Sequence, residues 1–307
     1  MIKRIRIPVD HGNGNIKTVN TVFKTGISAS DLAPGRGMEY LEYNGKFYLP
    51  SNRRIPYQRD KTKDPRFFAL TLMGIAKELE LNKNVQKGDI VQVQMPIGIP
   101  PKHFAELYEK YETYFRRNGE LLHFRYKDTD YHISIIDTRA FPQDYAAVML
   151  YHKDIAMYPR TTAVDIGAFT GDYLMFRYGE VDMEFCDSME MGIISLYNRV
   201  ITGIRADYDQ LLDEMDIDSI IRGKYDFYEG KIVQAVLGEV QAYARDLLSS
   251  LRERGIDPRS TYMIFLGGGS ILLKPFLEQT GMLNRYRFIE DIHANAKGYD
   301  WLYQQGA

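Results

Sequence analysis

The strongest constraint on the fold is a pattern that occurs twice in the chain, about 155 residues apart. Residues 2–9 alternate like a strand and end at Asp10, and a glycine turn then leads into a second strand-like segment at residues 16–23. Residues 161–165 run in the same way into a glycine turn, and Asp172 starts the next strand. Each occurrence predicts a strand that ends in an aspartate, a turn and another strand. The recurrence indicates two domains built on one plan.

The remaining patterns predict an α/β chain with mixed sheets flanked by helices. A length of 307 residues suits two domains of about 150 residues each. Asn44-Gly45 predicts a hairpin turn within residues 38–49, because both residue types tolerate the positive φ of a type I′ turn. Alternation predicts strands near 91–95, 120–126 and 130–137, and a short apolar run predicts a buried strand at 262–266. Helical spacing predicts helices at 65–79, 104–115, 144–157 and 230–254.

Charge and cysteine content exclude several classes of protein. The chain has 39 basic and 41 acidic residues, a formal charge of −2, so no overall field draws it to DNA or to an anionic membrane. Its one cysteine, Cys186, has no intramolecular partner for a disulfide, which fits a reducing compartment. We expect a cytoplasmic protein that binds neither nucleic acid nor membrane directly. The basic run from Arg53 to Lys63 is typical of a solvated loop.

The first aspartate turn has the composition of a phosphate-binding loop. Gly12 and Gly14 allow several backbone N–H groups to turn inward, and Lys17 adds a positive charge. The carboxylate of Asp10 at the strand end is suited to a hydrated Mg²⁺ that phosphates also bind. Taken alone, the turn is explained as well by a plain hairpin. His11 beside it has no catalytic partner in sequence and is interpreted as structural.

The second aspartate turn and a later glycine triplet extend this hypothesis. Asp165 repeats the position of Asp10, and two facing hairpins would hold the β- and γ-phosphates with both aspartates on one metal. Residues 267–270, Gly-Gly-Gly-Ser, follow the apolar strand and would let a base or ribose approach the backbone, with Ser270 capping the next helix. Neither a Walker A pattern nor a Gly-x-Gly-x-x-Gly helix start occurs, so P-loop and Rossmann sites are not supported.

In this order the three motifs resemble the superfamily of actin, sugar kinases and heat-shock chaperone ATPases. They correspond to its phosphate-1, phosphate-2 and adenosine motifs. Within the superfamily the chain is most similar to ParM-type proteins, bacterial actins that segregate plasmids. The segments that carry this closer resemblance are Asp10-x-Gly-x-x-Asn-Ile-Lys17, Asn44-Gly-Lys-Phe-Tyr48, Asp187-Ser188 before Gly192, and Asn295-Ala296 with Gly298.

The resemblance implies an actin-like, ribonuclease H-like fold with a nucleotide cleft between two similar domains. Residues 1–160 would form domain I, to which a last helix at 291–307 returns, and residues 161–290 would form domain II. It implies Mg²⁺ and ATP, with GTP left open, assembly of the chain with itself into filaments, and a DNA-binding adaptor protein as partner. The residues it assigns to the nucleotide are Gly12, Asn13, Gly14, Asn15, Lys17, Gly167, Ala168, Phe169, Thr170, Gly267, Gly268, Gly269 and Ser270, and those it assigns to the metal are Asp10 and Asp165.

The resemblance also assigns catalysis to Gln143 and Asp165. A glutamine or glutamate after the last strand of the first domain positions the attacking water in actin-like ATPases, and Phe141-Pro-Gln143 lies at the matching place. ParM-type proteins carry an acid there, so the rate of hydrolysis is in doubt, because an amide orients water but cannot take its proton. A helix-capping glutamine is the structural alternative. Asn13-Gly14 also replaces the hydroxyl pair common in the first turn, and Phe169 is bulky for the second.

Two other functions remain open from the sequence. One is a small-molecule kinase of the same superfamily, although no catalytic aspartate of a sugar pocket is recognisable. The other is a cytoskeletal or phage scaffold that binds nucleotide and hydrolyses it weakly, which the glutamine and the unusual turns would explain.

Overall fold

The computed structural model describes residues 1–35 and 37–306 and divides the chain into two compact units. The first unit contains Met1–Leu150 and residues 293–306, and the second contains Tyr151–Ile292. The division after Leu150 lies ten residues before the boundary expected after residue 160. Residues 151–160 pack within the second unit, because Asp154 accepts a hydrogen bond from Arg287 at 2.7 Å and Tyr158 stacks on Tyr262 at 4.2 Å.

A seven-stranded mixed sheet, in the order β1-β8-β10-β9-β6-β7-β5, forms the framework of the first unit. β1 and β10 both pair in parallel with β8. The strands of this sheet are β1 (Ile2–Arg6), β5 (Ile27–Ser30), β6 (Leu41–Tyr43), β7 (Lys46–Pro50), β8 (Ile90–Ile99), β9 (Leu121–Tyr126) and β10 (Thr129–Pro142). A separate three-stranded sheet contains β2 (Asp10–His11), β3 (Asn15–Lys17) and β4 (Val22–Lys24). The helices are α1 (Arg66–Leu81), α2 (Phe104–Arg116), α3 (Tyr145–Met149) and α9 (Ala294–Gln305).

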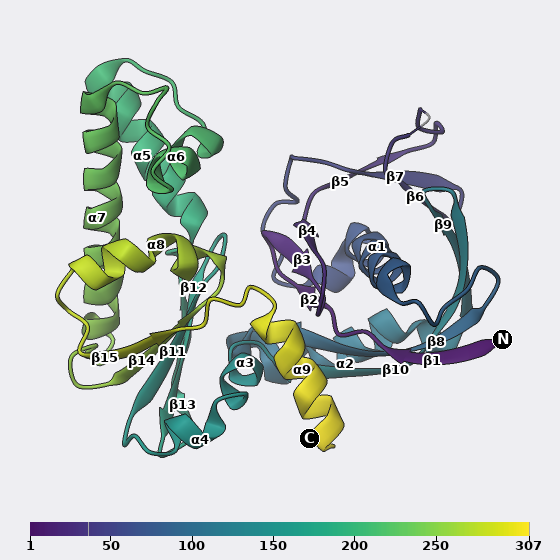
Figure 1. Cartoon of the computed structure of the whole chain (residues 1–307). Coiled ribbons are helices and arrows are strands. Elements are labelled where there is room, and N and C mark those ends of the chain that lie inside the picture. The colour runs from purple at the N-terminus through teal and green to yellow at the C-terminus, as the bar shows by residue number, and fades with distance from the viewer. Residues whose placement is uncertain (36, 307) are drawn as a thin grey trace. The chain divides into compact units, whose positions relative to one another are not determined.

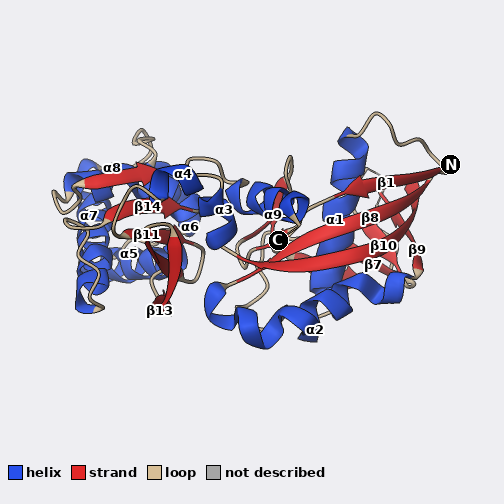
Figure 2. Cartoon of the chain, turned by 90° about the horizontal axis from the view of Figure 1, so that it is seen from below, coloured by secondary structure: helices blue, strands red, loops and turns tan. Residues whose placement is uncertain are grey.

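The core of the first unit forms around α1. Figure 1 shows this helix within the curve of the sheet, with β2, β3 and β4 beside it. Its buried side chains include Phe67, Phe68, Leu72 and Ile75, so apolar residues cover most of its circumference, as expected for a helix enclosed by strands. Each such side chain contributes roughly 1.5–3 kcal/mol on burial. Helix α2 runs along β10 on the sheet (Figure 2), and α9 packs on β8 and α3.

The second unit contains a five-stranded sheet in the order β13-β12-β11-β14-β15. β12 is antiparallel to both β11 and β13, whereas β14 is parallel to both β11 and β15. Its strands are β11 (Thr161–Ile166), β12 (Gly171–Arg177), β13 (Glu180–Met189), β14 (Tyr262–Leu266) and β15 (Arg285–Phe288). Its helices are α4 (His152–Ile155), α5 (Ile193–Tyr208), α6 (Glu214–Ile221), α7 (Gly230–Glu253) and α8 (Gly268–Gln279). Helices α5, α6 and α8 each pack on α7, and their buried faces form the core with the sheet.

The Asn44-Gly45 hairpin is confirmed, because both residues have positive φ, 50° and 72°.

Two strand predictions near the first turn are wrong. The regular strand expected at residues 2–9 ends at Arg6, although the N–H groups of Ile7 and Val9 still donate to the carbonyls of Gln94 and Pro96, both at 2.9 Å. The strand expected at 16–23 is interrupted by a turn in which the N–H of Thr18 donates to the carbonyl of Thr21 at 2.9 Å.

The helix expected at 144–157 consists of two short helices, α3 and α4, and the division between the units lies between them. No helix in the described part of the chain is both long and apolar enough to cross a membrane.

Candidate functional site

The carboxylate of Asp10 is the centre of a polar cluster in the first unit. Asp10 lies in β2 and is 2% exposed. The Nε2 of Gln143 donates to its Oδ1 at 2.9 Å, and the Nζ of Lys17 donates to its Oδ2 at 3.4 Å. A buried carboxylate requires such partners, because it loses its hydration. The structure therefore brings together three residues that the sequence analysis selected, two of them 133 positions apart.

Local backbone pairing explains how the three side chains meet. Asp10 is opposite Lys17 in the antiparallel ladder of β2 and β3, so both side chains point to the same face. Gln143 follows directly after β10, and its N–H donates to the carbonyl of Ile99 at 2.8 Å, which extends the pairing of β10 with β8 by one step. Gln143 is not an N-cap of α3, since Asp144 has that position.

The turn at residues 12–14 is held through its carbonyl groups. The Oγ1 of Thr25 donates to the carbonyl of Gly12 at 2.6 Å, and the N–H of Thr25 donates to the carbonyl of Gly14 at 3.0 Å. A Cβ at Gly12 would lie 2.5 Å from the carbonyl oxygen of Asn15, so this position requires glycine. No sequence pattern links Thr25 to this turn, so its two hydrogen bonds were not predicted.

His11 is fully buried and structural. Its Nε2 lies 2.8 Å from the Oγ1 of Thr71, which itself donates to the carbonyl of Phe67, so Nε2 must carry the proton. The ring stacks on Phe115 at 4.4 Å. Burial, with a smaller contribution from the charge of Lys61, lowers the pKa of His11 to about 3. The imidazole is therefore neutral at physiological pH.

Lys61 is an exception in the basic run, in which Arg53, Arg59 and Lys63 are exposed as expected. It is 2% exposed, and its Nζ donates to the carbonyl of His11, next to Asp10 in the chain. Its N–H donates to the hydroxyl of Tyr111 at 3.0 Å. A buried ammonium beside the first turn adds positive charge that the sequence analysis did not expect there.

The second aspartate turn is held mainly by backbone groups. The N–H of Gly167 donates to the carbonyl of Thr170 at 2.9 Å and closes the turn after β11. The carbonyls of Gly167 and Ala168 accept hydrogen bonds from the N–H groups of Ile193 and Ile194, at 3.0 and 2.8 Å, and so satisfy the first turn of α5. The turn and the start of α5 are therefore one rigid piece of backbone.

Gly192 makes the close approach of α5 to this turn possible. A Cβ there would lie 2.4 Å from the carbonyl carbon of Phe169 and 2.5 Å from the carbonyl oxygen of Ala168. In the sequence Gly192 was part of the resemblance to ParM-type proteins, and the structure gives its physical role. Asp172 pairs with Asp165 across β11 and β12, and its Oδ2 accepts from the Oγ1 of Thr170 at 3.2 Å.

The glycine triplet packs directly on Asp165. Gly267 has a φ of +85°, and a Cβ there would lie 1.9 Å from the Oδ1 of Asp165. A Cβ at Gly269 would lie 2.6 Å from the carbonyl oxygen of Ile166, whereas one at Gly268 would meet no described atom within 4 Å. Two of the three glycines are thus required by packing against β11, and Gly268 is the one that leaves open space.

The prediction that Ser270 caps the following helix is wrong. Helix α8 begins at Gly268 with Gly267 as its N-cap, so Ser270 already lies inside the helix. Its Oγ donates back to the carbonyl of Leu266. The helix begins earlier than expected because Gly267 adopts positive φ directly after β14.

The carboxylate of Asp10 is suited to a hydrated cation that also binds phosphates. Among residues 1–35 and 37–306, no three His, Cys, Asp or Glu side chains gather into a metal cage. Mg²⁺ usually keeps several water molecules and binds one or two carboxylates with the phosphates of a substrate. The buried carboxylate of Asp10, at the start of β2 beside a glycine turn, fits this mode of binding.

Comparison with known proteins identifies the fold. Residues 163–279 match the family model of the archaeal actin homologue MreB-like C-terminal region. The structure of Ta0583, an archaeal actin homologue in complex with ADP, covers 98% of this chain and 99% of its own, with a TM-score of 0.74 and 15% sequence identity. A ParM from a 15-stranded filament of Clostridium botulinum covers 99% of both chains, with a TM-score of 0.74 and 17% identity.

A ParM of Bacillus thuringiensis with ATP covers 98% of this chain and 99% of its own, with a TM-score of 0.65 and 15% identity. No curated protein sequence matches the chain. The similarity extends over nearly the whole length of these structures, and the resemblance to actin homologues predicted from the two aspartate turns and the glycine triplet is confirmed. The chain therefore has the actin fold, and its residues 163–279 match the archaeal actin-homologue family.

Proposed function

We propose that the chain is an actin-like ATPase that binds Mg²⁺ and ATP with its two aspartate turns and assembles into nucleotide-controlled filaments. The observation that carries the proposal is the bond from the amide of Gln143 to the carboxylate of Asp10, with Lys17 on the other oxygen. An acid, a cation and an amide thus meet at the start of β2. The solved structures of similar fold with ADP and with ATP support a nucleotide as the ligand.

Each residue has a defined chemical task in this proposal. Since the Nε2 of Gln143 donates to Asp10, its Oε1 is the atom left to accept a hydrogen bond from the attacking water. The amide orients that water and cannot take its proton, so we expect slow turnover. Lys17 supplies positive charge for the phosphates, and the backbone of the turns binds their oxygens.

Asp10 and Asp165 would hold the metal through its water shell. The bound cation would offset the negative charge of the phosphates. In the second unit, Gly267 packs closely on the carboxylate of Asp165, and a base or ribose would approach the backbone at Gly268, where a Cβ would meet no described atom. All residues assigned to the nucleotide in the sequence analysis remain part of this proposal, with the Oγ of Ser270 bonded to the carbonyl of Leu266.

Assembly is the second part of the proposal. The C. botulinum ParM of similar fold was solved as a filament, which supports contact between copies of this chain. A formal charge of −2 leaves little repulsion between subunits. Head-to-tail contacts between two different surfaces give open polymers. We place such filaments in the cytoplasm and assign them to segregation of plasmid or other DNA through a DNA-binding adaptor.

Electron microscopy and sedimentation of the purified chain with Mg·ATP, with Mg·GTP and without nucleotide test the proposal. We expect ordered filaments that depend on nucleotide. Filaments without phosphate release would favour the scaffold that hydrolyses weakly, which the neutral Gln143 makes the second candidate. A chain that stays monomeric with every nucleotide, well above micromolar concentration, would contradict assembly and favour a small-molecule kinase.

A further inference from the structure

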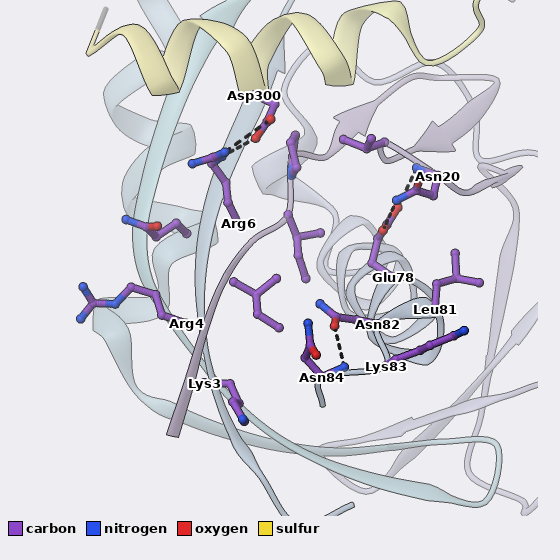
Figure 3. Close-up of a pocket in the computed structure, with 15 residues that line it drawn as sticks. Lys3, Arg4, Arg6, Asn20, Glu78, Leu81, Asn82, Lys83, Asn84 and Asp300 are labelled. Atoms are coloured by element: carbon purple, nitrogen blue, oxygen red, sulfur yellow. Dashed lines mark hydrogen bonds and ion pairs between the residues drawn. The ribbon is translucent and has the colours of Figure 1, made fainter. Parts of the chain in front are cut away.

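A basic groove lies beside β1 in the first unit. It has a volume of about 810 Å³ and runs between β1 and the end of α1. Figure 3 shows Lys3, Arg4 and Arg6 along β1, and Leu81 to Asn84 where α1 ends. At one side of the groove Arg6 pairs with Asp300, and at the other Asn20 donates to Glu78 at 2.9 Å.

The open edge of β1 forms one wall of the groove. β1 is the first strand in the order of its sheet, with β8 as its neighbour. The N–H of Ile7 donates to the carbonyl of Gln94 at 2.9 Å, and the carbonyl of Met1 accepts from Ile90 at 2.9 Å, so odd-numbered residues bond to β8. Backbone groups alternate in direction along a strand, so those of Ile2, Arg4 and Arg6 point to the open edge. Pro8, which has no N–H, ends this edge.

The charge of the groove is opposite to that of the chain. Four cations line it, Lys3, Arg4, Arg6 and Lys83, against two acids, Glu78 and Asp300, a balance of 4 − 2 = +2. The whole chain carries −2. Apolar surface accompanies this charge, since Leu81 is 59% exposed and Ile5 also lines the groove. An occupant must therefore present both acidic and apolar groups.

From these features we propose that the groove binds an extended acidic segment of a partner protein, which adds to the sheet as a strand beside β1. Exposed sheet edges bind extended peptides through main-chain hydrogen bonds, and side-chain pockets then give specificity. The edge offers alternating donors and acceptors at Ile2, Arg4 and Arg6. A phosphate or a lipid headgroup would leave those carbonyls unmatched, whereas a peptide satisfies both. The five residues of β1 set the length of the added strand.

Synthetic peptides of about seven residues, alternating Glu or Asp with Val, provide the probe. Fluorescence anisotropy measures their binding to the full chain. We expect the acidic peptide to bind, its lysine counterpart not to bind, and a form N-methylated at alternate residues to bind at least about tenfold more weakly. Equal binding of the N-methylated form, or competition by inorganic phosphate or by phosphatidylserine vesicles at matched charge, would assign the groove to anions in general and overturn the proposal.

Variants separate the backbone contribution from charge. Arg4→Pro removes a donor from the open edge and spares the ladder with β8, whereas Arg4→Ala removes the charge alone. We expect Arg4→Pro to bind the peptide at least about threefold more weakly than Arg4→Ala. Lys3→Glu with Lys83→Glu should weaken binding by about tenfold, and Lys46→Glu, on the β6–β7 hairpin of the same unit, should not change it.

Two results with these variants would contradict the proposal. One is equal binding by Arg4→Pro and Arg4→Ala, with circular dichroism showing both folded. The other is loss of filament mass when the peptide saturates the chain, because the groove would then be occupied by a second copy rather than by a separate partner.

Discussion

The two aspartate turns have the same plan and are held by different physical means. In the first, side chains fix the carboxylate, since Gln143 and Lys17 both donate to Asp10. In the second, glycines allow backbone to pack against the turn and its carboxylate, with Gly267 on Asp165 and Gly192 on residues 168 and 169. The carboxylate of Asp10 should therefore respond to loss of its hydrogen-bond partners, and the carboxylate of Asp165 to added volume at Gly267.

The largest effect should come from adding one methyl group to the second turn. Gly267→Ala places a Cβ on the carboxylate of Asp165 at a positive φ, and we expect it to destabilise the second unit by about 2–4 kcal/mol. Gly268→Ala is the matched control, because its Cβ would lie in open space, and it should stay within about 1 kcal/mol of the parent. Thermal unfolding measures both. Similar melting temperatures for the two variants would refute the steric account.

The first turn should carry a sensitivity to acid that comes from a buried histidine, a residue type that the second turn lacks. His11 has its pKa lowered from 6.5 to about 3 in the folded chain, so between these values the unfolded chain binds more protons. The stabilisation is complete above pH 6.5 and is lost as the pH falls, by about 2 kcal/mol between pH 7.5 and 5. The corresponding position of the second turn, Ile166, has no titratable group.

Urea unfolding of His11→Phe at several pH values measures this effect. The variant should be less stable at pH 7.5, because it loses the bond to Thr71, and its stability should fall less steeply with acid. A slope that is the same in His11→Phe and the parent would show that His11 is not the acid-sensitive group.

Removing either aspartate should impair hydrolysis, because both turns are proposed to act on one metal and one nucleotide. Asp165→Ala should lower phosphate release by at least about tenfold, and Asp10→Ala should do the same with weaker metal binding in addition. Phosphate release at saturating Mg·ATP and magnesium titrations measure the two effects. Unchanged turnover in Asp165→Ala would show that the second turn is not part of the hydrolytic site.

The smallest effect on nucleotide affinity should come from Gln143→Ala. The residue is proposed to contact water rather than nucleotide, so affinity should remain within a few-fold while hydrolysis falls and any filaments persist longer. Single-turnover assays with fluorescent ATP separate binding from chemistry. A collapse of affinity with unchanged turnover per bound nucleotide would mean that Gln143 only supports Asp10.

Sequence patterns predicted most strands and helices and the choice of Asp10 and Lys17, because alternation and glycine turns are local properties. The role of Gln143 came from resemblance to a family, and nothing local links it to Asp10, 133 positions away. The burial of Lys61 could not be predicted from sequence patterns, because its hydrogen bond to His11 depends on a distant turn.

The glycine triplet also makes contacts that sequence patterns did not predict. Sequence alone predicted an open approach for a ligand, whereas Gly267 and Gly269 are needed to pack on Asp165 and Ile166. These contacts join segments about 100 residues apart in the sequence. No residue pattern in either segment predicts that the two segments are in contact.

Calorimetric titration of the purified chain with Mg·ATP tests the central claim, that both aspartate turns serve a single nucleotide. The account predicts one ATP bound per chain, with affinity reduced by at least about tenfold in Asp10→Ala and also in Asp165→Ala when Mg²⁺ is present. Two independent sites, or one site that is sensitive to only one of the two substitutions, would contradict it.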